Sequence, residues 1–229
     1  MQNKKIGLYI SDGVTSSTIN VWLAHYKSGV VKNLNVLKAD DFIIDKLKEY
    51  ACIILPGGSG SKICNTLGAE HRSELIKYVE QGGSLLGVCA GAYAMSSGYE
   101  WSLSILNFEL IDKINAHRGE SNLTFTLTEV GKKMLKVKDT DLVDVYYHNG
   151  PVWKTFDIIK ENNSKILAVF KDDIYAFAGR RGEAPGTPAI IYDDYGLGKI
   201  IAISPHFEKS QGYEYVIKRV IQLLTQGKK

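Results

Sequence analysis

Few cysteines and no long apolar run characterise this chain. Its 229 residues include three cysteines, Cys52, Cys64 and Cys89, an odd and small number that gives no disulfide framework. Because Cys52 and Cys89 lie in apolar runs, we expect free thiols and a reducing compartment. No segment approaches the roughly 20 apolar residues of a membrane helix, and the apolar run Ile6–Ile10 is too short for a secretory signal. These absences predict a cytoplasmic protein without a membrane partner.

A strong charge of either sign is also missing. The formal net charge is +3 at pH 7, and the densest basic cluster, residues 132–138, is typical of a solvated face. We therefore expect no nucleic-acid partner. We expect a small-molecule substrate or ligand instead, and the sequence leaves both a monomer and a homo-oligomer as alternatives. Apolar residues make up 45% and charged residues 23%, the balance of a folded protein. Without repeats, low-complexity segments or a linker, residues 1–229 are expected to form one domain.

Nucleotide and metal signatures are absent as well. The glycine-rich loop Pro56–Ser61 is not followed by Gly-Lys-Ser/Thr at P-loop spacing, and no Gly-x-Gly-x-x-Gly occurs. His25, His71 and His117 have no cysteine, histidine or aspartate partner at ligand spacing. The sequence therefore predicts no cofactor and no metal.

The first half of the chain alternates short apolar runs with amphipathic stretches. The apolar runs predict strands at Lys5–Ile10, Asn33–Leu37, Ala51–Leu55 and Ser84–Val88. The amphipathic stretches predict helices from a Ser16 or Ser17 cap to Tyr26, from an Asp40 or Asp41 cap to about Tyr50, from Ala69 to Gln81, and directly after Cys89. Fully apolar strands joined by helices indicate a parallel sheet covered on both faces, and the right-handed crossover rule favours a doubly wound α/β fold.

The second half is richer in alternating and aromatic strands. We expect strands within Asn122–Gly131, Leu142–Trp153, Lys165–Phe170 and Ile174–Arg180, and a hairpin that pairs Pro188–Tyr192 with Lys199–Ser204. Asn149-Gly150 is a strong turn signal. A final helix from about Gly212 to Thr225 places on one face Val216, Val220, Leu223 and Leu224. The second half therefore adds a β-rich segment to the α/β pattern.

Cys89 lies at the centre of Gly87-Val88-Cys89-Ala90-Gly91, which fits the Gly-x-nucleophile-x-Gly pattern of a nucleophile elbow with cysteine in place of serine. In such an elbow the nucleophile occupies a strained strand-to-helix turn, so its neighbours must be small. The helix that follows points unpaired N–H groups at the sulfur, which favours a thiolate. The pentapeptide alone fits a buried structural cysteine equally well.

Two further stretches would complete an acyl-transfer site. The loop Pro56–Ser61 follows a core strand, so its backbone N–H groups, together with that of Ala90, can form an oxyanion hole; a plain surface turn is the simpler alternative. His206 comes just after a predicted strand and can serve as the base to Cys89. Glu208, two residues on, can orient the imidazole by accepting its other N–H.

In this order the stretches resemble the class I glutamine amidotransferase-like superfamily, which combines a Pro-Gly-Gly loop, a cysteine elbow and a late His-x-Glu. Within it, "LPGGSGS", "GGSLLGVCAGAYAMSS", "YYHNGPVW" and "ISPHFE" resemble the N-terminal domain family of biotin-protein ligases, which also has free-standing bacterial members. The resemblance runs from "IGLYISDGV" to "ISPHFE", nearly the whole chain. It implies a flavodoxin-like three-layer sandwich with the site at the carboxyl ends of the strands.

The resemblance also implies roles for individual residues. Cys89 would be the nucleophile, His206 the general base and Glu208 the orienting acid. The backbone N–H groups of Gly58 and Ala90 would hold the oxyanion.

A pocket beside the elbow is implied in the same way. The family's Tyr-Asn-Gly region falls on Tyr147 and Asn149-Gly150, with His148 inserted, and we place it beside the pocket without a catalytic role. The residues expected to line the pocket are Gly57, Ser59, Tyr93, Tyr147 and Asn149.

Three features depart from the family pattern. Glutamine-hydrolysing members usually carry Gln two residues after the second glycine of the elbow, where this chain has Tyr93, and this weakens the case for glutamine as substrate. Phe207 replaces the usual Pro in His-x-Glu, but the spacing of His and Glu is kept. The stretch Gly179–Gly186 resembles an adenylate loop only faintly and no ligase domain's length remains around it, so we predict no biotin-ligase activity.

These residues support two main hypotheses. The first is a cysteine-dependent hydrolase of amides or related C–N bonds, or the amidohydrolase half of an amidotransferase, with Cys89 attacking a carbonyl carbon. The second is a binding or regulatory module that keeps the scaffold without the reaction, in which Tyr93, Tyr147 and Trp153 would line a ligand pocket. A third and weaker hypothesis is a redox or carbonyl-stress protein that uses Cys89 with Asp12 from the first strand–helix turn.

Overall fold

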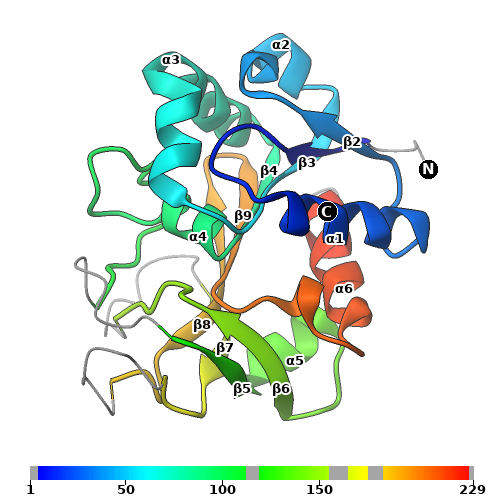
Figure 1. Ribbon diagram of the computed structural model, residues 1–229, viewed down its shortest axis with the longest axis vertical. Coiled ribbons are helices and arrows are strands. Elements are labelled where there is room, and N and C mark those ends of the chain that lie inside the picture. The colour runs from blue at the N-terminus through cyan, green and yellow to red at the C-terminus, as the bar shows by residue number, and fades with distance from the viewer. Residues whose placement is uncertain (1–4, 112–118, 155–164, 175–182, 227–229) are drawn as a thin grey trace.

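The computed structural model describes residues 5–111, 119–154, 165–174 and 183–226, and a nine-stranded sheet runs through its centre (Figure 1). The strand order is β2-β1-β3-β4-β9-β8-β7-β5-β6. The parallel block consists of β1 (Lys5–Tyr9), β2 (Leu34–Leu37), β3 (Tyr50–Leu55), β4 (Ser84–Val88) and β9 (Gly198–Ile203). The antiparallel block consists of β8 (Pro188–Tyr195), β7 (Lys165–Phe170), β5 (Glu120–Leu127) and β6 (Asp141–His148). The fold is therefore α/β, with a mixed sheet that carries the expected β-rich addition.

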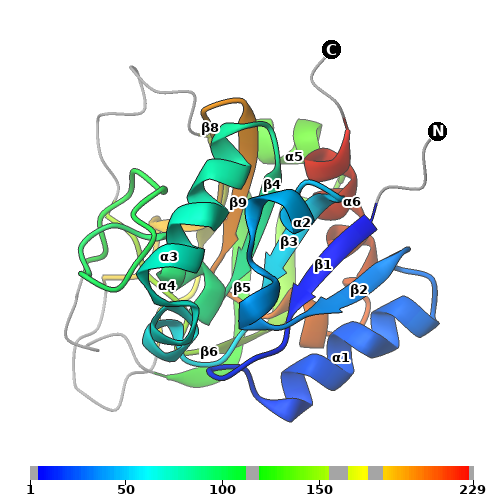
Figure 2. The same cartoon turned by 90° about the horizontal axis from the view of Figure 1, so that it is seen from above.

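Helices cover both faces of the parallel block, which gives three layers (Figure 2). One face packs against α1 (Ser16–Lys27) and α6 (Glu214–Thr225). The other face packs against α2 (Ile44–Leu47), α3 (Gly60–Glu80) and α4 (Ala90–Met95). A further helix, α5 (Glu129–Leu135), lies on β7. None of the helices in the described ranges is both long and apolar enough to span a bilayer.

Two-sided burial explains why the parallel strands are continuous apolar runs in the sequence. All five residues of β4 are buried, and the last four residues of β3 are buried as well. A strand covered on both faces has no solvent side on which to place polar residues. The one-sided pattern of α6 is confirmed too: Val216, Val220 and Leu224 are buried, whereas Leu223 is only partly buried.

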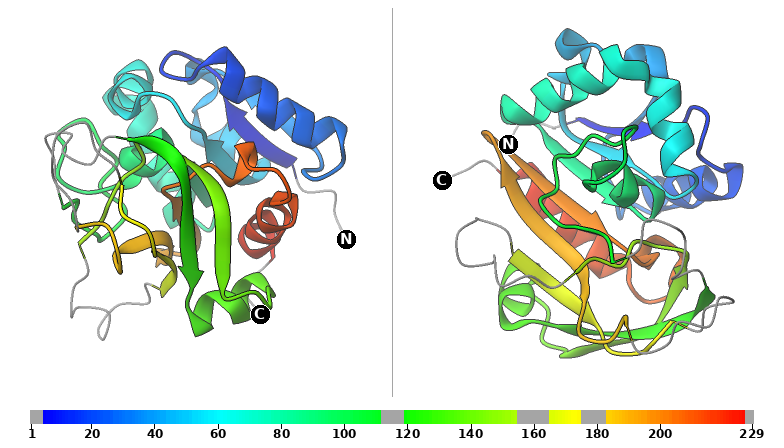
Figure 3. Two further views of the ribbon diagram at one scale, coloured as in Figure 1. Left: turned by 60° about the horizontal axis from the view of Figure 1, so that its bottom comes forward. Right: turned by 90° about the vertical axis from the view of Figure 1, so that its left-hand side faces the viewer.

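The antiparallel half of the sheet curls back toward the parallel half (Figure 3). β6 is the end strand, four places from β9 in the strand order, yet it touches the segment that follows β9. The N–H of His206 donates to the carbonyl of Tyr146 at 2.8 Å, and the N–H of Tyr146 donates to Ser210 Oγ at 2.9 Å. This closure brings the carboxyl end of β6 to the carboxyl ends of the parallel strands.

Two of the predicted helix starts are wrong: another side chain caps the first helix, and the second helix is replaced by a short 3₁₀ turn. Thr15, not Ser16 or Ser17, caps α1 by accepting the N–H of Thr18 at 3.3 Å. Asp40 and Asp41 do not begin a helix that reaches Tyr50. They belong to a single 3₁₀ turn, η1 (Ala39–Asp41), in which the Asp41 carboxylate accepts the N–H of Lys38 at 2.7 Å. Only the one-turn helix α2 follows before β3 begins.

Two other segment boundaries also differ from the prediction, and one predicted strand is not tested. α3 begins at Gly60 rather than Ala69, and Gly68, at φ 68° and ψ 177°, interrupts it, so the predicted helix is the second of two merged segments. Within Asn122–Gly131 the strand ends at Leu127, because Thr128 caps α5 by accepting the N–H of Gly131 at 2.9 Å. Of the strand expected at Ile174–Arg180, all but the first residue lies outside the described residues.

The hairpin near the C-terminus is confirmed. Residues of β8 and β9 pair in antiparallel register, for example Tyr192 with Ile201, around a turn that contains Gly196 at φ 57°. At the Asn149-Gly150 turn signal the chain makes only a bend, with Asn149 at φ 53° directly after β6.

Candidate active site

Cys89 occupies the turn between β4 and α4, as the elbow pattern predicts. Its backbone has φ 51° and ψ −102°, a conformation that residues with a side chain rarely adopt. Such a backbone costs about 1–3 kcal/mol and persists only where its surroundings hold it. Here the N–H of Cys89 donates to the carbonyl of Ile203 at 2.8 Å, and the N–H of Gly91 donates to that of Pro56 at 3.2 Å. The sulfur is therefore held at the junction of three segments.

The two glycines of the elbow are required by packing. A Cβ atom on Gly91 would lie 1.9 Å from the carbonyl oxygen of Leu55, in the neighbouring strand. A Cβ atom on Gly87 would lie 2.5 Å from Met95 Sδ and 2.6 Å from the Gly91 oxygen. The spacing Gly-x-Cys-x-Gly thus lets α4 turn back tightly against β3 and β4.

His206 and Glu208 form a buried charge pair. Glu208 Oε1 accepts a hydrogen bond from His206 Nδ1 at 2.6 Å, and the two side chains are 0% and 4% exposed. Burial by itself would lower the pKa of His206, but the charge of Glu208 and the neighbouring Cys89 sulfur outweigh it and raise that pKa to about 10. The imidazole is therefore a cation at neutral pH.

The short helix η3 (Phe207–Lys209), which contains Glu208 and directly follows His206, contacts the neighbouring segments on several sides. His25 of α1 contacts the carbonyl oxygen of Glu208 through Nε2 at 2.8 Å, and Ser210 Oγ donates to the carbonyl of His206 at 2.7 Å. A Cβ atom on Gly57 would lie 2.7 Å from Cε1 of the His206 ring. The glycine loop after β3 therefore leaves the space that the imidazole occupies.

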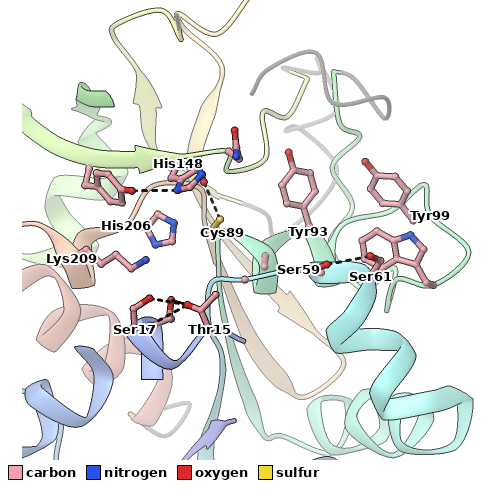
Figure 4. Close-up of a pocket in the computed structure, with 17 residues that line it drawn as sticks. Thr15, Ser17, Ser59, Ser61, Cys89, Tyr93, Tyr99, His148, His206 and Lys209 are labelled. Atoms are coloured by element: carbon pink, nitrogen blue, oxygen red, sulfur yellow. Dashed lines mark hydrogen bonds between the residues drawn. The ribbon is translucent and has the colours of Figure 1, made fainter. Parts of the chain in front are cut away.

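Cys89 and His206 face one cavity of about 630 Å³ at the carboxyl ends of the parallel strands (Figure 4). Most of the residues expected beside the elbow belong to its wall, namely Gly58, Ser59, Ala90, Tyr93 and Asn149. The remaining wall residues are Thr15, Ser17, Thr18, Gly60, Ser61, Tyr99, Trp101, Tyr146, His148 and Lys209. In the part of the chain that is described, no three His, Cys, Asp or Glu side chains gather as metal ligands.

Tyr147 does not line the cavity, contrary to expectation. Its side chain is fully buried, and its hydroxyl donates to the carbonyl of Gly150 at 2.8 Å. Side chains alternate along a strand, so the neighbours Tyr146 and His148 face the cavity instead. Trp153 is also buried, with Nε1 donating to Ser96 Oγ at 2.9 Å.

Gly57, Glu208 and Asp12 are not wall residues either. Gly57 and Glu208 lie behind His206 and support it, as described above.

Sequence reasoning missed the two ends of the cavity. One end contains Thr15, Ser17 and Lys209, and the other contains Tyr99 (Figure 4). The Tyr99 ring stacks on that of Trp101, with centroids 4.5 Å apart and an interplanar angle of 16°. These residues come from loops and helix starts that carry no motif. The alternation of side chains along β6 was the one sequence signal for these wall residues, because it places Tyr146 and His148 on the same face of the strand.

The three cysteines have different environments. Burial raises the pKa of Cys64 to about 12 and that of Cys52 further still, so both are inert thiols. Cys89 is 6% exposed at the cavity wall, and as a thiol it donates to the carbonyl of His148 at 3.3 Å.

The strand order and the helices on both faces define an α/β fold that is shared with solved structures of glutamine amidotransferases. The chain is similar to PurLQS from Thermotoga maritima, with a TM-score of 0.67 and 14% identity over 97% of this chain and 98% of that one. It is similar to a glutamine amidotransferase, with a TM-score of 0.63 and 17% identity over 96% and 99%. A ThuA-like protein from Bacteroides uniformis gives a TM-score of 0.65 and 13% identity over 97% and 91%. At these identities the similarity shows the fold alone.

The family is shown by the sequence itself. The profile described as "Biotin-protein ligase, N terminal" matches residues 4–221, and the chain belongs to this family. Comparison with curated proteins returned no match.

Proposed function

We propose that this protein hydrolyses an amide or a related C–N bond, with Cys89 as the nucleophile, His206 as the general base and Glu208 as the orienting acid. The observation that carries the proposal is the buried His206–Glu208 pair, at 2.6 Å, in contact with the cavity that Cys89 also faces. A buried imidazolium beside a cysteine favours the thiolate, which is the reactive form.

The proposed reaction has two halves. The Cys89 thiolate attacks the carbonyl carbon, and the carbonyl oxygen becomes an oxyanion. The C–N bond then breaks as the leaving nitrogen takes the proton from His206, and a thioester remains. In the second half, water gives a proton to His206 and attacks the thioester carbon. The products are a carboxylic acid and the regenerated thiolate.

The N–H groups of Gly58 and Ala90 are suited to receive the oxyanion. Ala90 is the first residue of α4, so its N–H has no partner within the helix. A Cβ atom on Gly58 would lie 1.9 Å from the Gly13 oxygen, so only glycine fits there. The next N–H group, that of Ser59, donates to the carbonyl of Gly13 at 2.7 Å. Within the described residues, no main-chain carbonyl takes up the N–H of Gly58 or of Ala90. Two N–H groups beside the sulfur are the usual requirement for an oxyanion hole.

A binding module on the same scaffold is the second candidate function. It is favoured by the thiol of Cys89, which donates to the His148 carbonyl at 3.3 Å. It is also favoured by Tyr93, which stands where glutamine-hydrolysing relatives carry Gln and whose hydroxyl donates to the carbonyl of Gly150 at 3.3 Å.

Acylation by p-nitrophenyl acetate distinguishes the two candidates. The hydrolase should release a burst of one equivalent of nitrophenolate and carry an acetyl group on Cys89, which peptide mass spectrometry detects. Cys89→Ala should abolish the burst, His206→Gln should slow it at least about tenfold, and Cys64→Ala should leave it unchanged. A panel of primary amides with ammonia as the readout then identifies turnover. A wild-type protein without a burst and without an adduct on Cys89 would leave the binding module as the function.

A further inference from the structure

One end of the cavity carries a lysine that pairs with no carboxylate of the described residues. Lys209 follows Glu208 directly, and its Nζ lies over the Tyr146 ring, 5.8 Å from the centroid. The ion pairs found in the described ranges all involve other cations. The Lys209 side chain points toward His206 and Ser17, into the cavity (Figure 4). A positive charge is thus available beside the candidate catalytic pair.

Hydroxyl groups from the start of α1 face the same space. Thr15 Oγ1 lies 3.0 Å from Ser17 Oγ and 3.0 Å from Thr18 Oγ1, and it also accepts the N–H of Thr18. Three hydroxyls have three protons, and their two mutual contacts use two of them, so one O–H remains to donate outward. Thr15 and Ser17 are exposed, which leaves Ser17 free to present that donor to a ligand. An anionic oxygen between Ser17 and Lys209 would accept a hydrogen bond from the hydroxyl of Ser17 and from the ammonium group of Lys209.

The described wall of the cavity contains no carboxylate. It contains Lys209 and the His206 cation but, among the described residues, neither Asp nor Glu. A free ammonium group, such as the α-amino group of glutamine, therefore meets no carboxylate there, and the one anion of the proposed function, the Cys89 thiolate, already pairs with the His206 cation. Burying an unpaired charge is costly, whereas an anion gains a charge-assisted hydrogen bond.

The opposite end is aromatic. Tyr99 and Trp101 stack on each other, and Trp101 Cη2 lies 3.2 Å from the position that a Cβ atom on Gly60 would take. Tyr93 also belongs to this end of the wall. Flat apolar surfaces of this kind favour planar or apolar groups.

We infer that the cavity selects compounds with an anionic oxygen group at one end, a planar apolar group at the other, and no free ammonium. The anionic group binds Lys209 and Ser17, and the apolar group lies against Tyr99 and Trp101. The position of the scissile amide, at Cys89 between the two ends, rests on the proposed function. The binding preference itself does not require that Cys89 react.

Calorimetric titration of the Cys89→Ala protein tests the inference without any catalysis. The probes are 3-phenylpropionate, the matched neutral 3-phenylpropionamide, the matched cation 3-phenylpropylamine, and inorganic phosphate. The carboxylate should bind at least about tenfold more tightly than the amide, and the amine should not bind. Phosphate that displaces the carboxylate with higher affinity would identify a phosphoryl group, rather than a carboxylate, as the anion.

Variants of Lys209 test whether this lysine causes the preference for the carboxylate over the amide. Lys209→Gln should reduce the preference for carboxylate over amide to about twofold or less, and Lys209→Arg should retain it. Lys62→Gln, at an exposed position next to Ser61 and outside the wall, is the matched control and should bind as the parent does. Equal binding of carboxylate and amide, a preference that survives in a folded Lys209→Gln protein, or no binding of any anion would overturn the inference. Failure of the proposed hydrolysis would show in the acylation assay and not in these titrations.

Discussion

Glu208→Gln tests the buried charge pair, because it keeps the shape of the side chain and removes its negative charge. In the wild-type protein the charge of Glu208 is the main cause that raises the pKa of His206 from 6.5 to about 10, against the opposing effect of burial. Without that charge, burial is opposed mainly by the Cys89 sulfur. We therefore expect the pKa of His206 in the variant to fall well below about 10.

The change should appear as a pH-dependent loss of stability. A histidine whose pKa is raised on folding stabilises the folded state fully below its unfolded pKa of about 6.5, and this contribution is lost as the pH rises through about 10. One pKa unit corresponds to about 1.4 kcal/mol, so the contribution amounts to a few kcal/mol. The free energy of unfolding of wild type should exceed that of the variant most at about pH 6, and the difference should shrink steadily toward about pH 10.

Urea unfolding at a series of pH values between these limits measures that difference. Glu109→Gln is the control, because Glu109 pairs with Lys154 on the surface at 2.9 Å and both side chains are about half exposed. It should change the free energy of unfolding by less than about 1 kcal/mol at every pH. A Glu208→Gln protein whose stability runs parallel to wild type over the whole range would refute the assignment of a buried ion pair.

Two further variants test how the site is held. Gly91→Ala places a Cβ atom 1.9 Å from the Leu55 oxygen, so it should lower the free energy of unfolding by several kcal/mol or prevent folding. The control Gly29→Ala meets nothing within 4 Å and should lower the free energy of unfolding by about 1 kcal/mol. Thermal unfolding measures both. A Gly91→Ala protein as stable as Gly29→Ala would contradict the packing argument. His25→Ala removes the contact with the Glu208 carbonyl, so it should lower stability by about 1 kcal/mol and slow the acylation burst; an unchanged burst rate would show that η3 does not need this contact.

The parallel half of the fold and the elbow could be predicted because their signals are local. The strands β3 and β4 are apolar throughout since helices cover both faces, and the glycines around Cys89 are dictated by atoms within a few ångströms. The starts of α1 and α3 were missed, because a threonine cap and a helix that resumes after Gly68 leave only weak sequence patterns.

The wall of the cavity could not be predicted because it depends on contacts between distant segments. Alternation along β6 gives two faces, but which face meets the site depends on the curl of the sheet, fixed by contacts such as that between the His206 N–H and the Tyr146 carbonyl. The family resemblance placed Tyr147 in the wall, where Tyr146 and His148 lie instead. Lys209 has no motif of its own, and only the closure of η3 against α1 places it in the cavity.

The most direct test of the central claim, that His206 activates Cys89, is the rate at which iodoacetamide alkylates each of the three cysteines at neutral pH. Cys52 and Cys64 serve as internal controls, because burial holds their pKa values far above neutrality. The account predicts that Cys89 alone is alkylated in the folded protein and that His206→Gln slows this reaction at least about tenfold. A Cys89 that reacts no faster than the two buried cysteines, or equally fast with and without His206, would contradict it.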